Sequence, residues 1–231
     1  MDIIYIVLIV GVVIVSLVAQ QSLKSKFKKY SKVGLQIGLS GKEVAELMLR
    51  DNGIHDVNVV SVQGRLTDHY NPLDKTVNLS PEVYGGRSVM AAAVAAHECG
   101  HAVQHAKAYR PLEMRSALVP VQQAGGRIIN IMFWILIIGS LGVSLFPMQW
   151  AILGIIAAYT IFTIFAFITL PVEYDATKRA LAWVEERNIT TSQEHDMAAD
   201  ALNAAARTYL VAALGSLATL AYWVLAFLGD R

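Results

Sequence analysis

Four long apolar runs without a charged residue constrain this chain more than any other feature of its sequence. They cover residues 3–19, 128–146, 150–170 and 209–228, and each is about as long as the ~20 residues that a helix needs to cross a ~30 Å hydrocarbon core. Hydrophobic residues make up 55% of the chain and charged residues only 16%, which is typical of membrane proteins. The runs therefore predict a mainly α, helical membrane protein with four spans.

The positions of the basic residues predict how these spans are oriented. Every lysine and arginine except Arg231 lies between spans one and two or between spans three and four. The positive-inside rule places both of these segments in the cytoplasm and both termini outside. Asp2 precedes the first run and a lysine cluster at 24–32 follows it, which indicates an uncleaved anchor rather than a signal peptide. The cluster could also contact anionic headgroups, although setting the topology is the simpler interpretation.

This topology divides the chain into five parts. They are a first span (1–22), a cytoplasmic domain (23–127), a transmembrane hairpin (128–170), cytoplasmic helices (171–208), and a fourth span with an outer C-terminus (209–231). The net charge of +1 gives no reason to expect a nucleic-acid partner. We expect a lipid bilayer around the spans and the chemistry in the cytoplasmic segments.

Residues 97–101 read His-Glu-Cys-Gly-His, an H-E-x-x-H motif that follows an alanine-rich run favouring helix. On a helix His97 and His101 lie about 40° apart around the axis, with β-carbons roughly 5–6 Å apart, so that both could bind one metal ion. Glu98 would lie beside that face, where it is badly placed to be a ligand but suits a general base. Cys99, the only cysteine, excludes an internal disulfide and would pack behind the site.

A hydrolytic zinc site usually has three protein ligands and leaves one position for water. The third histidine of a metzincin would fall at Lys107, which excludes that class. Glu173 is the best candidate, because the hairpin of spans two and three would return it to the cytoplasmic side. His105 and His195 remain competing candidates.

Local signals predict an α+β domain around the motif. Ser40 and Thr191 begin capping boxes, and the second should open a helix that continues into the fourth span. Ser88 is a plausible N-cap of the H-E-x-x-H helix. Residues 57–62 favour a strand and residues 65–79 a hairpin or two short edge strands. Such an edge could pair with an extended peptide, or simply form a small sheet that packs on the helix.

Prolines and glycines predict interruptions elsewhere. We expect the helical segment 112–130 to be interrupted at Pro120 and at Gly125 and Gly126, and a new helix to begin at Pro171 as the chain leaves the membrane.

The sequence His-Glu-Cys-Gly-His-Ala-Val-Gln-His at 97–105, with Pro-Val-Glu-Tyr-Asp-Ala at 171–176, resembles the YugP family of bacterial membrane zinc metallopeptidases over essentially the whole chain. It is more distantly similar to membrane gluzincins of the HtpX and CAAX-processing type. The resemblance implies a bacterial plasma-membrane protein with a cytoplasmic, zincin-like metallopeptidase domain built from an active-site helix and a small sheet. It also implies zinc ligation by His97, His101 and Glu173, with Glu98 as the catalytic base.

One departure from the distant relatives concerns the groups that orient the ligands. They usually carry an aspartate four residues after the ligand glutamate, where this chain has Thr177. Other acids could orient a ligand histidine, and several side chains could stabilise an oxyanion. The first group comprises Asp175, Asp196 and Asp200, and the second comprises Tyr109, Tyr174, Arg179 and His195.

We therefore expect a zinc-dependent endopeptidase of the gluzincin type that acts on protein or peptide substrates near the membrane surface. The alternative is a non-catalytic membrane scaffold with a structural or silent zinc site, which predicts a closed set of four ligands. A metal transporter is disfavoured because the four runs contain no charged residue.

Overall fold

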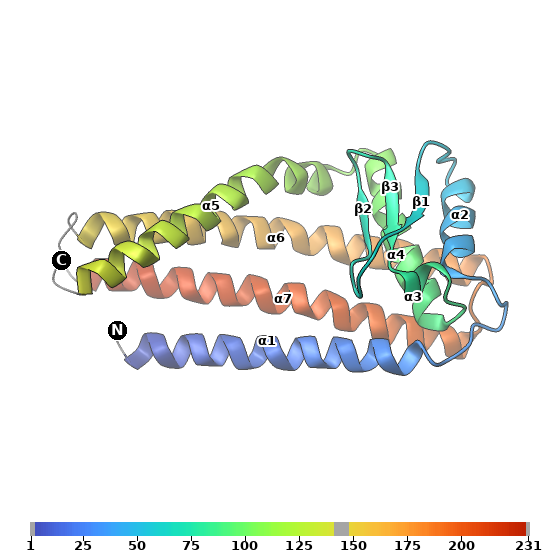
Figure 1. Ribbon diagram of the computed structural model, residues 1–231, viewed down its shortest axis with the longest axis horizontal. Helices are drawn as coiled ribbons and strands as arrows, with labels where there is room; N and C mark the ends of the chain where they lie inside the picture. Colours follow the sequence, from blue (N-terminus) through green and yellow to red (C-terminus); the bar gives the residue numbers. More distant parts are fainter. Residues whose placement is uncertain (1–2, 141–147, 230–231) are drawn as a thin grey trace. The chain divides into compact units, whose positions relative to one another are not determined.

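The computed structural model describes residues 3–140 and 148–229, and this part of the chain is mainly helical with one three-stranded sheet (Figure 1). The elements are α1 (Ile3–Tyr30), α2 (Gly41–Asp51), β1 (Asn58–Ser61), β2 (His69–Asn71), β3 (Thr76–Leu79), α3 (Pro81–Tyr84), α4 (Val89–Ala106), α5 (Arg110–Ser140), α6 (Met148–Glu186) and α7 (Ser192–Gly229).

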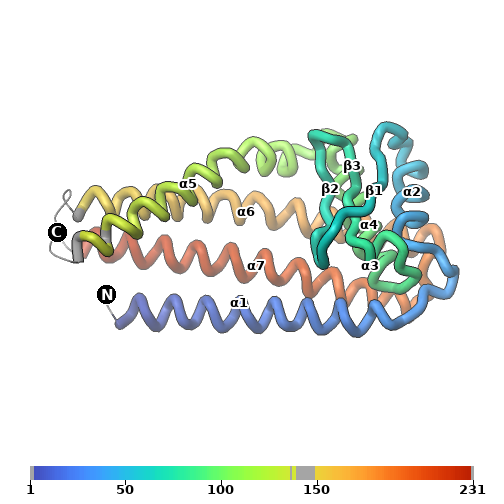
Figure 2. The backbone as a smooth tube through the Cα atoms, in the orientation of Figure 1, coloured from blue at the N-terminus to red at the C-terminus, as the bar shows by residue number. Residues whose placement is uncertain are grey.

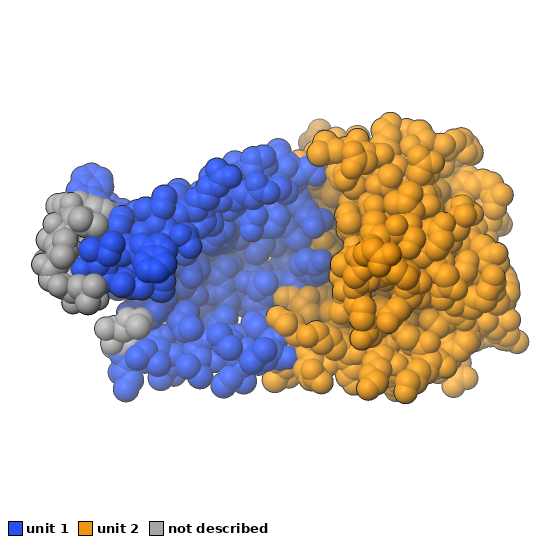
Figure 3. Space-filling model, viewed as in Figure 1, with its two compact units in different colours: residues 1–17, 114–170, 209–231 blue, residues 18–113, 171–208 orange. Residues whose placement is uncertain are grey.

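The chain forms two compact units, which Figure 3 colours separately. The first contains residues 1–17, 114–170 and 209–231, and the second contains residues 18–113 and 171–208. The first unit therefore collects most of the apolar runs, and the second collects the H-E-x-x-H motif together with the residues that follow the third run.

Three helices of the described residues are long and apolar enough to cross a membrane, namely α1, α6 and α7. They contain the predicted first, third and fourth spans. The predicted second span, 128–146, begins within α5, but its residues 141–146 and the turn at Phe146–Gln149 fall largely outside the described residues.

Glycines allow close helix packing within the first unit. A β-carbon at Gly215 of α7 would lie 2.9 Å from a side-chain carbon of Val12 on α1, and one at Gly154 of α6 would lie 3.1 Å from the sulfur of Met132 on α5. Helices in a bilayer often associate through such small residues, which let their backbones approach closely.

The second unit has a sheet of order β1-β3-β2 that packs beside α4 (Figure 2). β1 is parallel to β3, and β2 is antiparallel to it, so β2 forms an edge. Val77 and Leu79 of β3 are fully buried, and they share a core with Val44 and Met48 of α2. This core holds α4 against the sheet and fixes the surroundings of the motif.

The predicted helix starts in this unit are confirmed. Ser40 forms a reciprocal capping box with Glu43, and the Ser88 hydroxyl accepts a hydrogen bond from the backbone N–H of Ala91 at the start of α4. Thr191 interacts with Glu194 in the same way as α7 begins, and α7 continues into the fourth apolar run as expected.

The predicted interruptions at the prolines are wrong. α5 continues through Pro120, Gly125 and Gly126, and α6 continues through Pro171. A proline in a helix costs about 3 kcal/mol, but a long apolar helix can absorb that cost, because neighbouring groups and small local adjustments satisfy the freed carbonyl. Glu173 therefore belongs to the same rigid helix as the third span.

Candidate metal centre

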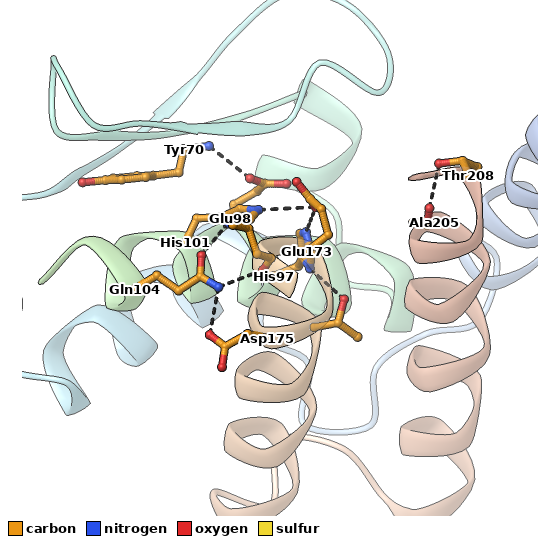
Figure 4. A network of polar contacts seen from close by, with 11 residues as sticks. Tyr70, His97, Glu98, His101, Gln104, Glu173, Asp175, Ala205 and Thr208 are labelled. Atoms are coloured by element: carbon orange, nitrogen blue, oxygen red, sulfur yellow. Dashed lines mark hydrogen bonds and ion pairs between the residues drawn. The ribbon is translucent and has the colours of Figure 1, made fainter. Parts of the chain in front are cut away.

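Three side chains of the second unit converge between α4 and α6 (Figure 4). His97 and His101 lie on successive turns of α4, and Glu173 faces them from α6. Each residue offers one ligand atom, and these three atoms lie within 4.8 Å of one another. Nε2 of His97 is 3.4 Å from Oε2 of Glu173, and Nε2 of His101 is 3.6 Å from the same oxygen.

These distances fit a zinc ion. With bonds of ~2.0–2.1 Å and tetrahedral angles, two ligand atoms of one zinc lie roughly 3.3 Å apart. Two imidazole nitrogens and a carboxylate oxygen are also a ligand set found in catalytic zinc sites. Among the described residues, the group contains these three members and no other, which leaves a fourth position for water.

Burial makes this cluster an electrostatically strong site. Burial alone raises the pKa of the Glu173 carboxyl, but hydrogen bonds and charge interactions with His101 and His97 outweigh it, so the pKa lies far below its usual value. Burial likewise lowers the pKa of His101, but Glu173 and then Glu98 raise it, and the net shift is upward. Glu173 follows the third apolar run and is only 2% exposed. The pocket thus keeps an anionic carboxylate that favours a bound cation.

Glu98 lies beside the cluster without belonging to it, as the helical spacing predicted. Its Oε2 accepts a hydrogen bond of 3.0 Å from the backbone N–H of Tyr70 on β2, and Figure 4 shows this contact above the two histidines. The edge strand therefore holds one oxygen of the predicted base. The sequence predicted the strand, but it gave no signal for this particular contact.

Each histidine of α4 also has a partner on its other ring nitrogen. Nδ1 of His97 lies 3.2 Å from the hydroxyl of Thr177 on α6. Nδ1 of His101 lies 3.0 Å from Oε1 of Gln104. Thr177 therefore contacts the histidine from the position where the distant relatives usually have an aspartate. Gln104 was not among the predicted site residues, although a residue three positions after His101 lies on the same helix face.

Gly100 lets α4 and α6 approach closely at this site. A β-carbon there would lie 2.7 Å from the carbonyl oxygen of Ala176 and 3.1 Å from its Cα. Both are backbone atoms, so no side-chain rotation could make room. The glycine inside the motif therefore sets the distance between the helix that carries the two histidines and the helix that carries Glu173.

The competing ligand candidates lie elsewhere. His105 is exposed, and its Nδ1 lies 2.7 Å from the hydroxyl of Tyr70. His195 lies 3.9 Å from Glu185 on α6. Neither belongs to the metal-binding group found among the described residues. Cys99 is fully buried behind the site, where its thiol contacts the carbonyl of Ala45, as predicted.

Of the three acids considered for orienting a histidine, one is connected to the cluster. Asp175 accepts a hydrogen bond from Gln104, and Arg179 binds the same carboxylate oxygen at 2.6 Å. Asp200 instead binds Lys26 and Tyr30 of α1. Asp196 is exposed.

Comparison with known proteins gives an independent result. The profile of a family described as "Putative neutral zinc metallopeptidase" matches residues 5–228. The chain is also 40% identical over 213 residues to a protein of Bacillus subtilis (strain 168) named "Putative membrane protease YugP", and the alignment covers 92% of each chain. No solved structure matches the chain.

Proposed function

Since the chain belongs to this zinc metallopeptidase family, we propose that it hydrolyses peptide bonds with one zinc ion held by His97, His101 and Glu173. The observation that carries the proposal is the convergence of three ligand atoms within 4.8 Å, two from one helix and one from another. Such a site is of the gluzincin type, with two histidines and a glutamate as ligands.

Glu98 is the group that we assign to proton transfer. Bound zinc would supply Lewis acidity and lower the pKa of a water molecule towards ~7. The Glu98 carboxylate is adjacent in sequence to the ligand His97, and its Oε2 is fixed by the N–H of Tyr70. From there it can accept a proton from the attacking water and later donate it to the leaving amine.

The edge strand β2 is the surface on which we place the peptide. In an antiparallel pair, a residue points both its N–H and its C=O either towards its partner strand or away from it. The Tyr70 N–H is bound to Glu98 rather than to β3, so the Tyr70 carbonyl also faces away from β3. An extended substrate could donate a backbone N–H to that carbonyl, which would bring its main chain next to Glu98.

The topology that we propose has four spans, with both units of the catalytic machinery at the cytoplasmic surface of the bacterial plasma membrane. The distribution of basic residues supports it. Because His97, His101 and Glu173 lie outside the apolar runs, we expect endopeptidase cleavage in water close to the bilayer. Cytoplasmic segments and juxtamembrane ends of membrane proteins would then be the substrates.

Two variants of the purified full chain test this function. Glu98→Gln should bind zinc as the wild type does but lose cleavage of a reporter peptide panel, because it keeps the size of the side chain and removes the base. Glu173→Ala should lower the zinc content, since it removes one of three ligands. A chelator should abolish wild-type cleavage, and zinc should restore it.

Different results would refute separate parts of the proposal. A fully active Glu98→Gln variant would remove Glu98 from the mechanism, and an unchanged zinc content in Glu173→Ala would point to another ligand. A wild-type protein that binds zinc but cleaves no peptide of the panel would favour the scaffold alternative. Against that alternative, the described residues provide three ligands rather than a closed set of four.

A further inference from the structure

Gln104 is the most deeply buried polar side chain next to the metal centre, with 0% exposure. It lies one turn after His101 on α4, and its amide makes three hydrogen bonds. Oε1 faces Nδ1 of His101 at 3.0 Å, and Nε2 donates to the carbonyl of Val172 and to Oδ2 of Asp175, each at 2.8 Å. Figure 4 shows this amide between His101 and Asp175.

The two contacts of Nε2 determine which way the amide points. A backbone carbonyl oxygen and a carboxylate oxygen are both acceptors, so only the NH₂ group of Gln104 can face them. The opposite orientation would place the amide oxygen against two other oxygens and leave both hydrogens of the amide without these partners. This orientation therefore follows from the surroundings and not from an arbitrary choice between O and N.

The amide orientation in turn selects one tautomer of His101. Because both amide hydrogens are used, Oε1 can only accept a hydrogen bond from the ring, so Nδ1 of His101 must carry a hydrogen. In the neutral ring the lone pair then lies on Nε2. This is the nitrogen that lies 3.6 Å from Glu173 within the metal-binding group.

We propose that Gln104 is a positioning residue that holds His101 as its Nδ1–H tautomer and thereby presents the Nε2 lone pair to the metal. The proposal rests on the zinc site of the proposed function. Asp175 and Val172 act one step further out, since they fix Gln104, and Arg179 holds Asp175 in place through a 2.6 Å contact. Residues 101, 104, 172 and 175 thus connect α4 to α6 through a single amide.

Removal of the amide should release this selection. In Gln104→Met, a substitution of similar length without hydrogen bonds, nothing would require a hydrogen on Nδ1. The metal-free ring could then place its hydrogen on Nε2 and donate it to Glu173, which would block the atom that the metal needs. Loss of such an orienting partner commonly weakens metal binding 10–100-fold, so we expect a decrease in zinc affinity within that range.

The test uses the full-length protein in detergent, stripped of metal and labelled with ¹⁵N-histidine. At a pH where the imidazoles are neutral, ¹⁵N chemical shifts show which nitrogen of His101 carries the hydrogen, and a His101→Gln variant identifies the signal. Zinc affinity is measured by competition with a chromogenic chelator. Gln193→Met, at an exposed position, is the matched control and should leave both readouts unchanged.

The wild type should show the Nδ1–H tautomer, and Gln104→Met should lose it and bind zinc more weakly. A wild-type ring protonated on Nε2 would overturn the proposal without reference to any variant, even if Gln104→Met failed to fold. A folded Gln104→Met protein with the wild-type tautomer and zinc affinity would also overturn it. A wild type that binds no zinc would instead refute the proposed function, and the tautomer of the metal-free ring would still be measurable.

Discussion

Replacing Gly100 by alanine tests whether the close approach of α4 and α6 builds the metal centre. The new β-carbon would lie 2.7 Å from the carbonyl oxygen of Ala176, about 0.7 Å closer than the 3.4 Å at which ordinary contact begins. Since the neighbouring atoms belong to the backbone of α6, the two helices must move apart or bend.

The expected effect on stability has the opposite sign from that of helix propensity. Alanine in place of glycine inside a helix usually stabilises it by about 0.5–1 kcal/mol. Overpacking of a tight contact costs about 1–3 kcal/mol. The clash should therefore dominate, with a net loss of roughly 1–2 kcal/mol in the free energy of unfolding.

Zinc affinity should fall as well. Metal–ligand distances tolerate changes of about ±0.2 Å, which is less than the separation that the clash requires. His101 follows Gly100 directly on α4, and Glu173 lies one turn before Ala176 on α6. We expect at least a tenfold weaker zinc affinity, because the carboxylate would move away from the two imidazoles.

Thermal unfolding of the metal-stripped protein in detergent, together with chelator competition for zinc, measures both effects. The matched control is Gly126→Ala in α5, where a β-carbon would meet nothing within 4 Å. This control should be as stable as the wild type or slightly more stable. If Gly100→Ala unfolds at or above the wild-type temperature and binds zinc equally well, the reasoning about helix distance is refuted.

Two further substitutions test contacts around the site and near α1. Thr177→Val should weaken zinc binding up to about tenfold, because Nδ1 of His97 loses its hydroxyl partner; Thr177→Ser should restore binding, and equal affinity of the valine variant would contradict this role. Hydrogen bonds from Lys26 and Tyr30 lower the pKa of Asp200, so its contribution to stability is present above the unfolded pKa of about 3.9 and is lost as the pH falls through the lower folded pKa. Asp200→Asn should therefore lower the melting temperature at neutral pH, by up to ~1 kcal/mol of stability, and a difference that persisted in strong acid would contradict the pairing.

Local rules predicted the parts of the site that depend on one helix. The separation of His97 and His101 is a property of helix geometry, and the same geometry places Glu98 beside the cluster and Cys99 behind it. Glu173 could be predicted only by adding the membrane hairpin to these rules. Its place in the cluster agrees with that argument.

Contacts between distant segments were beyond the reach of the sequence. Gln104, Thr177 and the Tyr70 N–H are defined by what lies opposite them in space, and nothing in their own residue types distinguishes them from other glutamines, threonines or strand residues. The continuity of α6 through Pro171 was missed for a related reason. The rule for proline is local, whereas the favourable terms that outweigh it are summed over a helix of 39 residues.

The choice of partners for the two imidazoles has an electrostatic consequence. Glu173 and Glu98 already supply two negative charges at the cluster, which would balance the charge of one zinc ion. A carboxylate bound directly to either histidine would make the surroundings anionic and oppose the lowering of the water pKa. Here a hydroxyl and an amide, from Thr177 and Gln104, take that place, and the charge of Asp175 is one hydrogen bond further away and paired with Arg179. The neutral partners can therefore orient the rings without reducing the acidity that hydrolysis requires.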